Sequence, residues 1–220
     1  MRKRILVLAA AALLSLSCSD GRSYDQVICA LIDISGTYAD QKAEVVRILK
    51  GDVLLEMLPG DTLIVIQIDS KSYEKDNLVA LMTLDPRPSR ANAQKLALAQ
   101  TLDAFAASDA RSRYTDIPGA MMLGTEYLRE REAGSRVMLV FSDMAEDLPK
   151  GAKRQLAESE FAGIQVVAMN VKRLQGDSAD PAVFRGRLAA WEKRVTASGA
   201  LGWENFMDAT KLSGYLAQIR

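Results

Sequence analysis

The chain has 220 residues, with 28 basic and 28 acidic side chains and no histidine. This length suits a single domain. Without histidine, Ser-His-Asp and Cys-His catalysis are excluded, and the commonest zinc ligand is missing. The remaining polar chemistry is that of carboxylates and hydroxyls, oxygen ligands that suit a hard cation such as Mg²⁺.

Residues 1–18 have the pattern of a secretory signal. Three cations precede the apolar run Ile5 to Leu14, which is too short to span a bilayer. The five residues that end at Cys18 resemble a bacterial lipobox, although Ser15 stands where leucine is usual. The resemblance implies cleavage before Cys18 and a lipid on its thiol, which would anchor the chain to a membrane. An ordinary cleaved signal is the alternative.

Removal of this signal would leave 25 basic and 28 acidic residues, because the segment holds three cations and no acid. Such a balance does not indicate a nucleic-acid partner. Residues 19–25 are expected to be a short tether, and residues 26–220 to form one domain. Cys29 lies in an apolar run, so it is expected to be a small buried hydrophobic residue.

Short aliphatic runs alternate with segments of helical period along residues 26–220, a pattern typical of a mostly parallel sheet with helices on both faces. This predicts a three-layer α/β/α sandwich. The expected strands are Gln26 to Asp33, Thr62 to Ile68, Leu78 to Leu84, Arg136 to Ser142 and Ile164 to Asn170. The expected helices are Tyr38 to Met57, Ser89 to Ala107, Asp116 to Glu132, Lys150 to Phe161, Pro181 to Ser198 and Thr210 to Ile219.

The strand expected at Leu78 to Leu84 follows a polar segment, Ser70 to Asn77, that can form either a long loop or a hairpin. If that hairpin forms, the strand is an antiparallel edge. Trp191 and Trp203 are expected to pack the last helices against the sheet. The basic segment from Lys150 to Arg154 is expected to be an exposed helix start.

Acids and hydroxyls occur at three joins between predicted strands and helices. The first strand ends in Asp33, followed by Ser35 and Thr37; Thr115 precedes a predicted helix, and Asp143 follows a later apolar strand. Ligands bind at this carboxyl edge in open α/β sheets. Taken singly, each group could equally be a helix cap or a turn. Together they indicate a metal site.

This set resembles the metal-ion-dependent adhesion site of von Willebrand factor A-type domains, in which Asp-x-Ser-x-Ser is followed by a separate Thr and a separate Asp. Thr37 stands where the family usually has its second Ser. The resemblance implies that Ser35, Thr37 and Thr115 coordinate Mg²⁺, Mn²⁺ or Ca²⁺ through hydroxyls. Asp33 and Asp143 would coordinate the metal directly or hold its waters.

The resemblance implies a non-enzymatic protein that binds an acidic side chain of a partner through the metal, at the bacterial cell envelope. One alternative is a haloacid dehalogenase-like phosphohydrolase with Asp33 as nucleophile, but Ser35 replaces the acid that such enzymes use as general acid and base. Another is a scaffold of the same fold that binds no metal.

Overall fold

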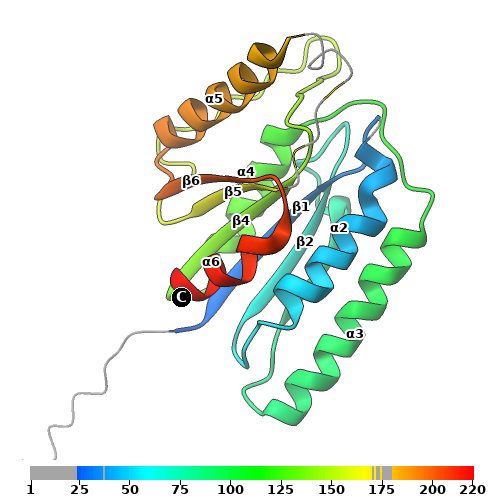
Figure 1. The fold of residues 1–220 in the computed structure, drawn as a ribbon, viewed down its shortest axis with the longest axis vertical. Coiled ribbons are helices and arrows are strands. Elements are labelled where there is room, and N and C mark those ends of the chain that lie inside the picture. The colour runs from blue at the N-terminus through cyan, green and yellow to red at the C-terminus, as the bar shows by residue number, and fades with distance from the viewer. Residues whose placement is uncertain (1–23, 37, 170, 172–173, 175–179) are drawn as a thin grey trace, which may run out of the picture.

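A computed structural model describes residues 24–36, 38–169, 171, 174 and 180–220 (Figure 1). In this part of the chain, six strands form one sheet in the order β3-β2-β1-β4-β5-β6. All neighbouring strands are parallel except β2 and β3. The strands are β1 (Gln26–Asp33), β2 (Thr62–Ile68), β3 (Leu78–Thr83), β4 (Ser135–Phe141), β5 (Gln165–Met169) and β6 (Gly202–Phe206).

The helical segments cover both faces of this sheet, which confirms the predicted three-layer α/β/α sandwich (Figure 1). The α-helices are α2 (Lys42–Ile48), α3 (Pro88–Ala107), α4 (Ile117–Arg129), α5 (Pro181–Ala197) and α6 (Leu212–Gln218). Shorter turns are η1 (Tyr38–Gln41), η3 (Lys75–Asn77) and η5 (Ala209–Lys211), and a π-helical segment, η2 (Leu49–Leu54), continues α2.

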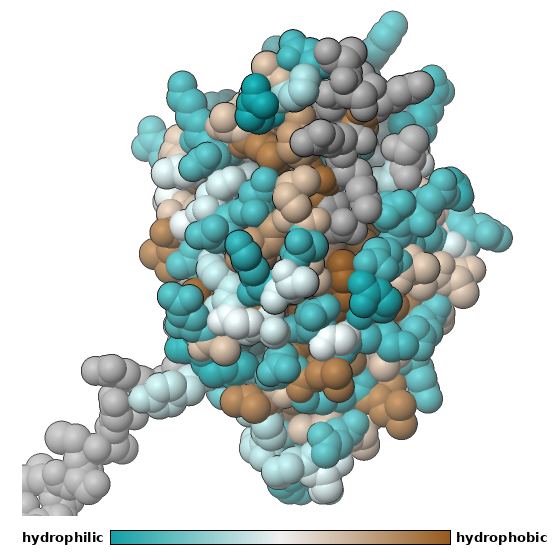
Figure 2. All heavy atoms as spheres, viewed as in Figure 1, coloured by the Kyte–Doolittle hydropathy of each residue, from teal (hydrophilic) through white to brown (hydrophobic). Residues whose placement is uncertain are grey.

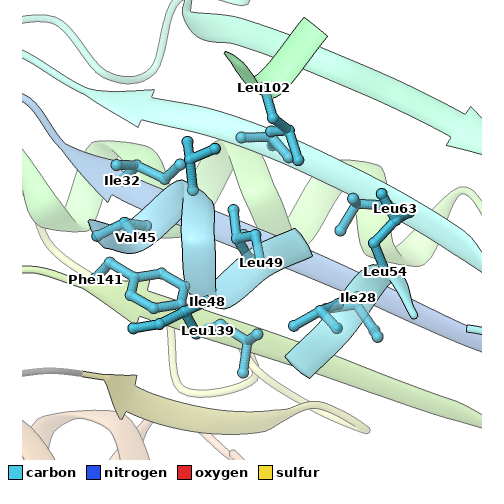
Figure 3. Close-up of a cluster of buried hydrophobic side chains, with 14 of the residues drawn as sticks. Ile28, Ile32, Val45, Ile48, Leu49, Leu54, Leu63, Leu102, Leu139 and Phe141 are labelled. Carbon is cyan, nitrogen blue, oxygen red and sulfur yellow. The ribbon is translucent and has the colours of Figure 1, made fainter. Parts of the chain in front are cut away.

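Strand β1 is central and is buried along its whole length. Its side chains alternate between the two faces, because successive residues of a strand point to opposite sides. Ile28 and Ile32 belong to the core under α2, η2, α3 and α6 (Figure 3), whereas Cys29 and Leu31 belong to the core under α4 and α5. This two-sided burial explains why the strand is almost wholly apolar.

The antiparallel β3 confirms the predicted edge strand. It pairs with β2 through a hairpin, whereas β1 lies between β2 and β4. The chain therefore crosses from one side of β1 to the other between β3 and β4. The carboxyl ends of β1 and β4 form the switch point of the sheet, where open α/β sheets place their ligands.

The helix predicted from Lys150 to Phe161 is wrong, because this segment consists of turns and irregular chain. Its two largest apolar residues, Leu156 and Phe161, both pack against the core under α4 and α5, yet they are five positions apart. A helix would not place such residues on one face. Arg154 is also drawn into an ion pair with the buried Asp116, so tertiary contacts override helix propensity here.

Strand β6 was not predicted. It is short, half-buried at the sheet edge, and contains Glu204 and Asn205 between its aromatic residues, so it lacks the aliphatic run on which strand prediction depends. Trp203 lies in this strand and packs against the core under α4 and α5, while Trp191 is buried on α5; both residues thus join a late helix to the sheet as expected.

The N-terminal predictions concern residues that are largely outside the described part of the chain. Cys18, the segment before it and residues 19–23 are not described, so the signal, the lipid and most of the tether stay predictions. Among the described residues, none of the helices has the length and apolar character needed to cross a bilayer.

Candidate metal centre

The carboxylate of Asp33 is buried where β1 ends and has no exposed surface. Its Oδ1 accepts hydrogen bonds from the backbone N–H of Ser35, at 2.8 Å, and from the Ser35 hydroxyl, at 2.6 Å. Its Oδ2 accepts one from the hydroxyl of Ser142, at 2.6 Å. Among the described residues, Asp33 has no basic partner in an ion pair, so its negative charge is stabilised by neutral donors alone.

Burial is the main reason that the pKa of Asp33 rises from 3.8 to about 6. The hydrogen bonds from Ser142 and Ser35 lower this pKa, and the negative charge of Asp143 raises it further. A second carboxylate therefore adds its charge to an already buried one. Both carboxylates would gain from a cation placed between them and the neighbouring hydroxyls.

Thr115 reaches this carboxylate through Ser35. The Ser35 and Thr115 hydroxyl oxygens are 2.5 Å apart, although the two residues are 80 positions apart in the chain. Because the Ser35 hydroxyl donates its proton to Asp33, the Thr115 hydroxyl is the donor to Ser35. Both residues are nearly buried, with exposed fractions of 7% and 6%. Three of the five predicted ligands, Asp33, Ser35 and Thr115, thus form one hydrogen-bonded group.

Of the other two predicted ligands, the structure describes Asp143 but not Thr37. Asp143 directly follows Ser142 and is half-buried; its carboxylate accepts a hydrogen bond from the backbone N–H of Ala145 at 2.8 Å. Thr37 lies outside the described residues. The sequence predicted Ser142 only as the last residue of a strand, and its contact with Asp33 depends on the pairing of β1 with β4, which the sequence alone does not reveal.

Backbone hydrogen bonds join the segments that carry these residues. Thr115 and Asp147 exchange two of them, Thr115 N to Asp147 O at 2.7 Å and Asp147 N to Thr115 O at 3.1 Å. The N–H of Ser112 donates to the carbonyl of Ile34 at 2.9 Å. These hydrogen bonds therefore hold the loops after β1, before α4 and after β4 together around the Ser35 and Thr115 hydroxyls.

Asp116, next to Thr115, is the N-cap of α4 and accepts a hydrogen bond from the N–H of Gly119. A Cβ at position 119 would lie 2.4 Å from the Asp116 carboxylate, so only glycine permits this approach. The guanidinium of Arg154 pairs with the same carboxylate at 2.9 Å. The expectation of an exposed helix start at Lys150 to Arg154 is thus wrong for Arg154, which holds the segment after β4 against α4.

Helix α5 also holds this segment. The indole N–H of Trp191 donates to the carbonyl of Met144 at 2.8 Å, and Arg194 pairs with Glu146 at 2.7 Å. Met144 has a φ of 61°, a left-handed conformation that is unfavourable for a side chain of this type and is maintained by surrounding contacts. The position of Asp143 therefore depends on α5.

The donor set fits a hard divalent cation. It consists of carboxylate and hydroxyl oxygens, and no His or Cys lies among the predicted ligands. Across the described residues, no three His, Cys, Asp or Glu side chains gather into a possible metal cluster. A cation at Asp33 would therefore need the hydroxyls of Ser35 and Thr115, and of Thr37 as the sequence predicts, to complete its coordination.

The substitution Asp33→Asn is expected to stabilise the chain in EDTA at pH 7.5 by about 3 kcal/mol, because the amide removes a buried charge. The pKa of Asp33 is higher in the folded chain than in the unfolded chain, so this stability difference develops as pH rises from about 4 to about 6 and is constant above. Urea unfolding at several pH values measures it. Asp76→Asn, at an exposed position, is the control. Equal stability of wild type and Asp33→Asn at pH 7.5 would contradict the cost assigned to the buried carboxylate.

No protein-family profile and no curated protein matches the sequence, but solved structures do. A von Willebrand factor type A structure from Catenulispora acidiphila is similar with a TM-score of 0.54 and 10% identity, over 90% of this chain and 42% of that one. The PilB minor pilin from Streptococcus sanguinis, as its D319A mutant, gives 0.53 and 9%, over 92% and 62%. The pilus adhesin SpaC from Lactobacillus rhamnosus GG, in an open conformation, gives 0.51 and 14%, over 90% and 30%.

The chain thus spans less than two thirds of the length of each of these three proteins. Identities of 9–14% show a shared fold. Together with the six-stranded, mostly parallel sheet and its single antiparallel edge, these similarities show that the chain has a von Willebrand factor A-type fold.

Proposed function

We propose that this chain is a non-enzymatic module that binds a divalent metal at Asp33, Ser35, Thr37, Thr115 and Asp143, and binds a protein partner through that metal. The observation that carries the proposal is the buried Asp33 carboxylate, which lacks a basic partner among the described residues and lies in one hydrogen-bonded group with the Ser35 and Thr115 hydroxyls. Mg²⁺ is the expected metal, with Mn²⁺ or Ca²⁺ as substitutes.

The partner would supply an acidic side chain to the metal. Two carboxylates balance the charge of a divalent cation, but with three hydroxyls they leave room in its coordination sphere for a further oxygen ligand. A carboxylate is the ligand that a hard cation favours most strongly among protein side chains. The similarity to a pilus adhesin and a minor pilin supports adhesion or assembly as the setting.

Catalysis receives less support from the same geometry. In the phosphohydrolase alternative, Asp33 would be a nucleophile and its neighbour two positions later would be a proton donor and acceptor. That neighbour is Ser35, whose hydroxyl donates to Asp33 and has the Thr115 hydroxyl within hydrogen-bonding distance. A role for Ser35 and Thr115 as metal ligands uses both hydroxyls, whereas the phosphohydrolase gives Thr115 no role.

Calorimetric titration of the full chain with Mg²⁺ and Mn²⁺ tests the metal site. One site is expected, and Thr115→Val, which removes the hydroxyl at nearly constant shape, is expected to weaken binding by tenfold or more. Thr125→Val is the matched control, because Thr125 is also buried and belongs to α4 but is not a predicted ligand. Equal loss in both variants, or binding of neither metal even with glutarate added as a carboxylate ligand, would contradict the proposal.

The module would be attached to the bacterial envelope by a lipid on Cys18, at its periplasmic face or outer membrane. Residues 19–25 would form the tether, and β1 begins directly after them at Gln26. The tether then enters the fold at the amino end of β1, whereas the proposed metal ligands lie at its carboxyl end. A membrane-bound chain would therefore direct its metal site away from the lipid surface.

Expression of the full chain in a bacterial host tests the anchor. The wild-type chain is expected to carry acyl groups on an N-terminal Cys18 and to sediment with membranes, because the cleaved lipobox exposes that residue for acylation. Cys18→Ser is expected to prevent both, whereas Cys29→Ser, at the buried free cysteine, controls for loss of a thiol. Intact mass spectrometry measures the acyl mass. A wild-type product cleaved at another residue, without added lipid, would show an ordinary signal instead.

A further inference from the structure

Large apolar side chains are exposed at the amino end of the sheet, the end at which its five parallel strands begin. Among the described residues, eight large hydrophobic side chains are exposed, and four of them lie at this end: Tyr24, Leu55, Leu58 and Leu201. We call these four residues the amino-end patch. The strands begin at the left and lower left of Figure 1, and Figure 2 shows hydrophobic residues at the surface on this side.

The patch extends across the width of the sheet. Tyr24 precedes β1, Leu55 and Leu58 lie between η2 and β2, and Leu201 precedes β6. Strands β2 and β6 are four positions apart in the sheet order, a separation of about 20 Å at the usual spacing of neighbouring strands. The patch is therefore broad enough to contact a flat surface at several points.

Packing within the described chain does not explain these residues. None of the four belongs to either hydrophobic core or to the partly buried residues that pack against the cores. Single exposed apolar residues are common on protein surfaces, but a concentration of them on one side marks a contact with another apolar surface. The position of this side in the chain indicates which surface that is.

The backbone of the patch is held by a buried carboxylate. Asp61 has no exposed surface, and it accepts hydrogen bonds from the N–H of Leu58 at 2.6 Å and from the N–H of Gln26 at 2.8 Å. The guanidinium of Arg220 pairs with Asp61 at 2.7 Å and donates to the carbonyl of Tyr24 at 3.4 Å. These contacts join the loop before β2 to the start of β1. Tyr24 and Leu58 are thus exposed from an ordered backbone.

The distance to the proposed lipid is short. Tyr24 is only six residues after Cys18, and six residues span at most about 20 Å when the chain is fully extended. A lipid on Cys18 would therefore keep the amino end of the sheet beside the bilayer. At such a distance the effective concentration of lipid is high, so even weak apolar contacts would form.

The basic residues near the patch have partners within the chain. Arg220 pairs with Asp61, Arg131 pairs with Glu130, and Arg129 donates to backbone carbonyls. Exposed acidic side chains also lie at this end: Asp25, Glu56 and Glu132. This end therefore suits apolar contact with a bilayer better than ionic contact with anionic headgroups.

We propose that the amino-end patch inserts into the interfacial region of the bilayer that holds the lipid of Cys18. This inference rests on the proposed lipid anchor and adds a protein surface to it. Leucine side chains would enter the boundary between headgroups and acyl chains, and the amphipathic ring of Tyr24 suits the headgroup level. The contact would fix the orientation of the fold, with Asp33 and the other proposed ligands at the opposite ends of the strands.

A fluorophore at position 58 tests the contact. The full chain carrying Leu58→Cys is produced in a bacterial host, labelled at the new thiol with the polarity-sensitive dye NBD, and reconstituted into phosphatidylcholine vesicles. The label attaches at position 58, because Cys29 is buried and Cys18 would carry the lipid. A blue shift of the NBD emission is expected, together with quenching by lipids that carry a nitroxide on an acyl chain.

Val183→Cys, labelled in the same way, is the matched control. Val183 is 53% exposed, against 51% for Leu58, but it lies in the first turn of α5, away from the amino end of the sheet. Quenching at position 58 is expected to exceed quenching at position 183 by about threefold or more, because only the patch reaches the acyl chains.

A charge placed elsewhere in the patch should weaken the same signal. Leu201→Glu is expected to lower quenching at position 58 by about twofold or more, because a carboxylate is unfavourable below the headgroups. Met207→Glu is its control, since Met207 is also exposed and follows β6 at the other end of the strand. Unfolding midpoints verify that both variants are folded.

The outcomes separate this inference from the anchor itself. An acylated chain whose label is quenched equally at positions 58 and 183 would overturn the bilayer contact and leave the anchor standing. A blue shift that appears only in vesicles with anionic lipid would replace apolar insertion by headgroup recognition. A chain that intact mass spectrometry shows to lack acyl groups would overturn the anchor, and this inference with it.

Discussion

The burial of one negative charge at the end of the central strand is the constraint on which the rest of the site depends. Asp33 has no exposed surface, and the donors to its carboxylate are the Ser35 backbone and the hydroxyls of Ser35 and Ser142. Burial of a carboxylate is costly unless opposite charge or hydrogen bonds compensate for it. A divalent cation would supply the missing charge, and hydroxyl ligands would hold it without adding more negative charge. A bound divalent cation would therefore make this arrangement more favourable.

The fold brings together segments that are far apart in the sequence. Parallel pairing of β1 with β4 brings Ser142 to Asp33, and backbone bonds between Thr115 and Asp147 join the loop before α4 to the loop after β4. The ion pair of Arg154 with Asp116 and the hydrogen bond from Trp191 to the Met144 carbonyl then hold the second loop in place. Asp33, Ser35 and Thr115 would therefore need little rearrangement to bind a metal, which would lower the entropic cost of assembling a site from separate stretches of chain.

Sequence patterns were sufficient to predict the layers, the five aliphatic strands and the edge direction of β3, because strands buried on both faces must be apolar and helices must have one apolar face. They failed where tertiary contacts outweigh local preference. The segment from Lys150 to Phe161 has the composition of a helix, but Arg154 pairs with Asp116 and the spacing of Leu156 and Phe161 is not helical. Strand β6 was missed because its half-buried position at the sheet edge permits polar residues, so it lacks the apolar run that predicts a strand.

For the site, the sequence predicted which residues end their strands at the same edge, but not how they contact each other. The contact between Ser35 and Thr115 across 80 positions and the role of Ser142 require the strand order.

The most direct test of the account is a crystal structure of the chain grown with Mn²⁺, with anomalous difference density calculated at the manganese absorption edge. The account predicts one strong peak within about 2–2.5 Å of the hydroxyl oxygens of Ser35 and Thr115. An ordered chain with no peak beside Asp33, or with Mn²⁺ bound only elsewhere on its surface, would contradict the metal-dependent mechanism.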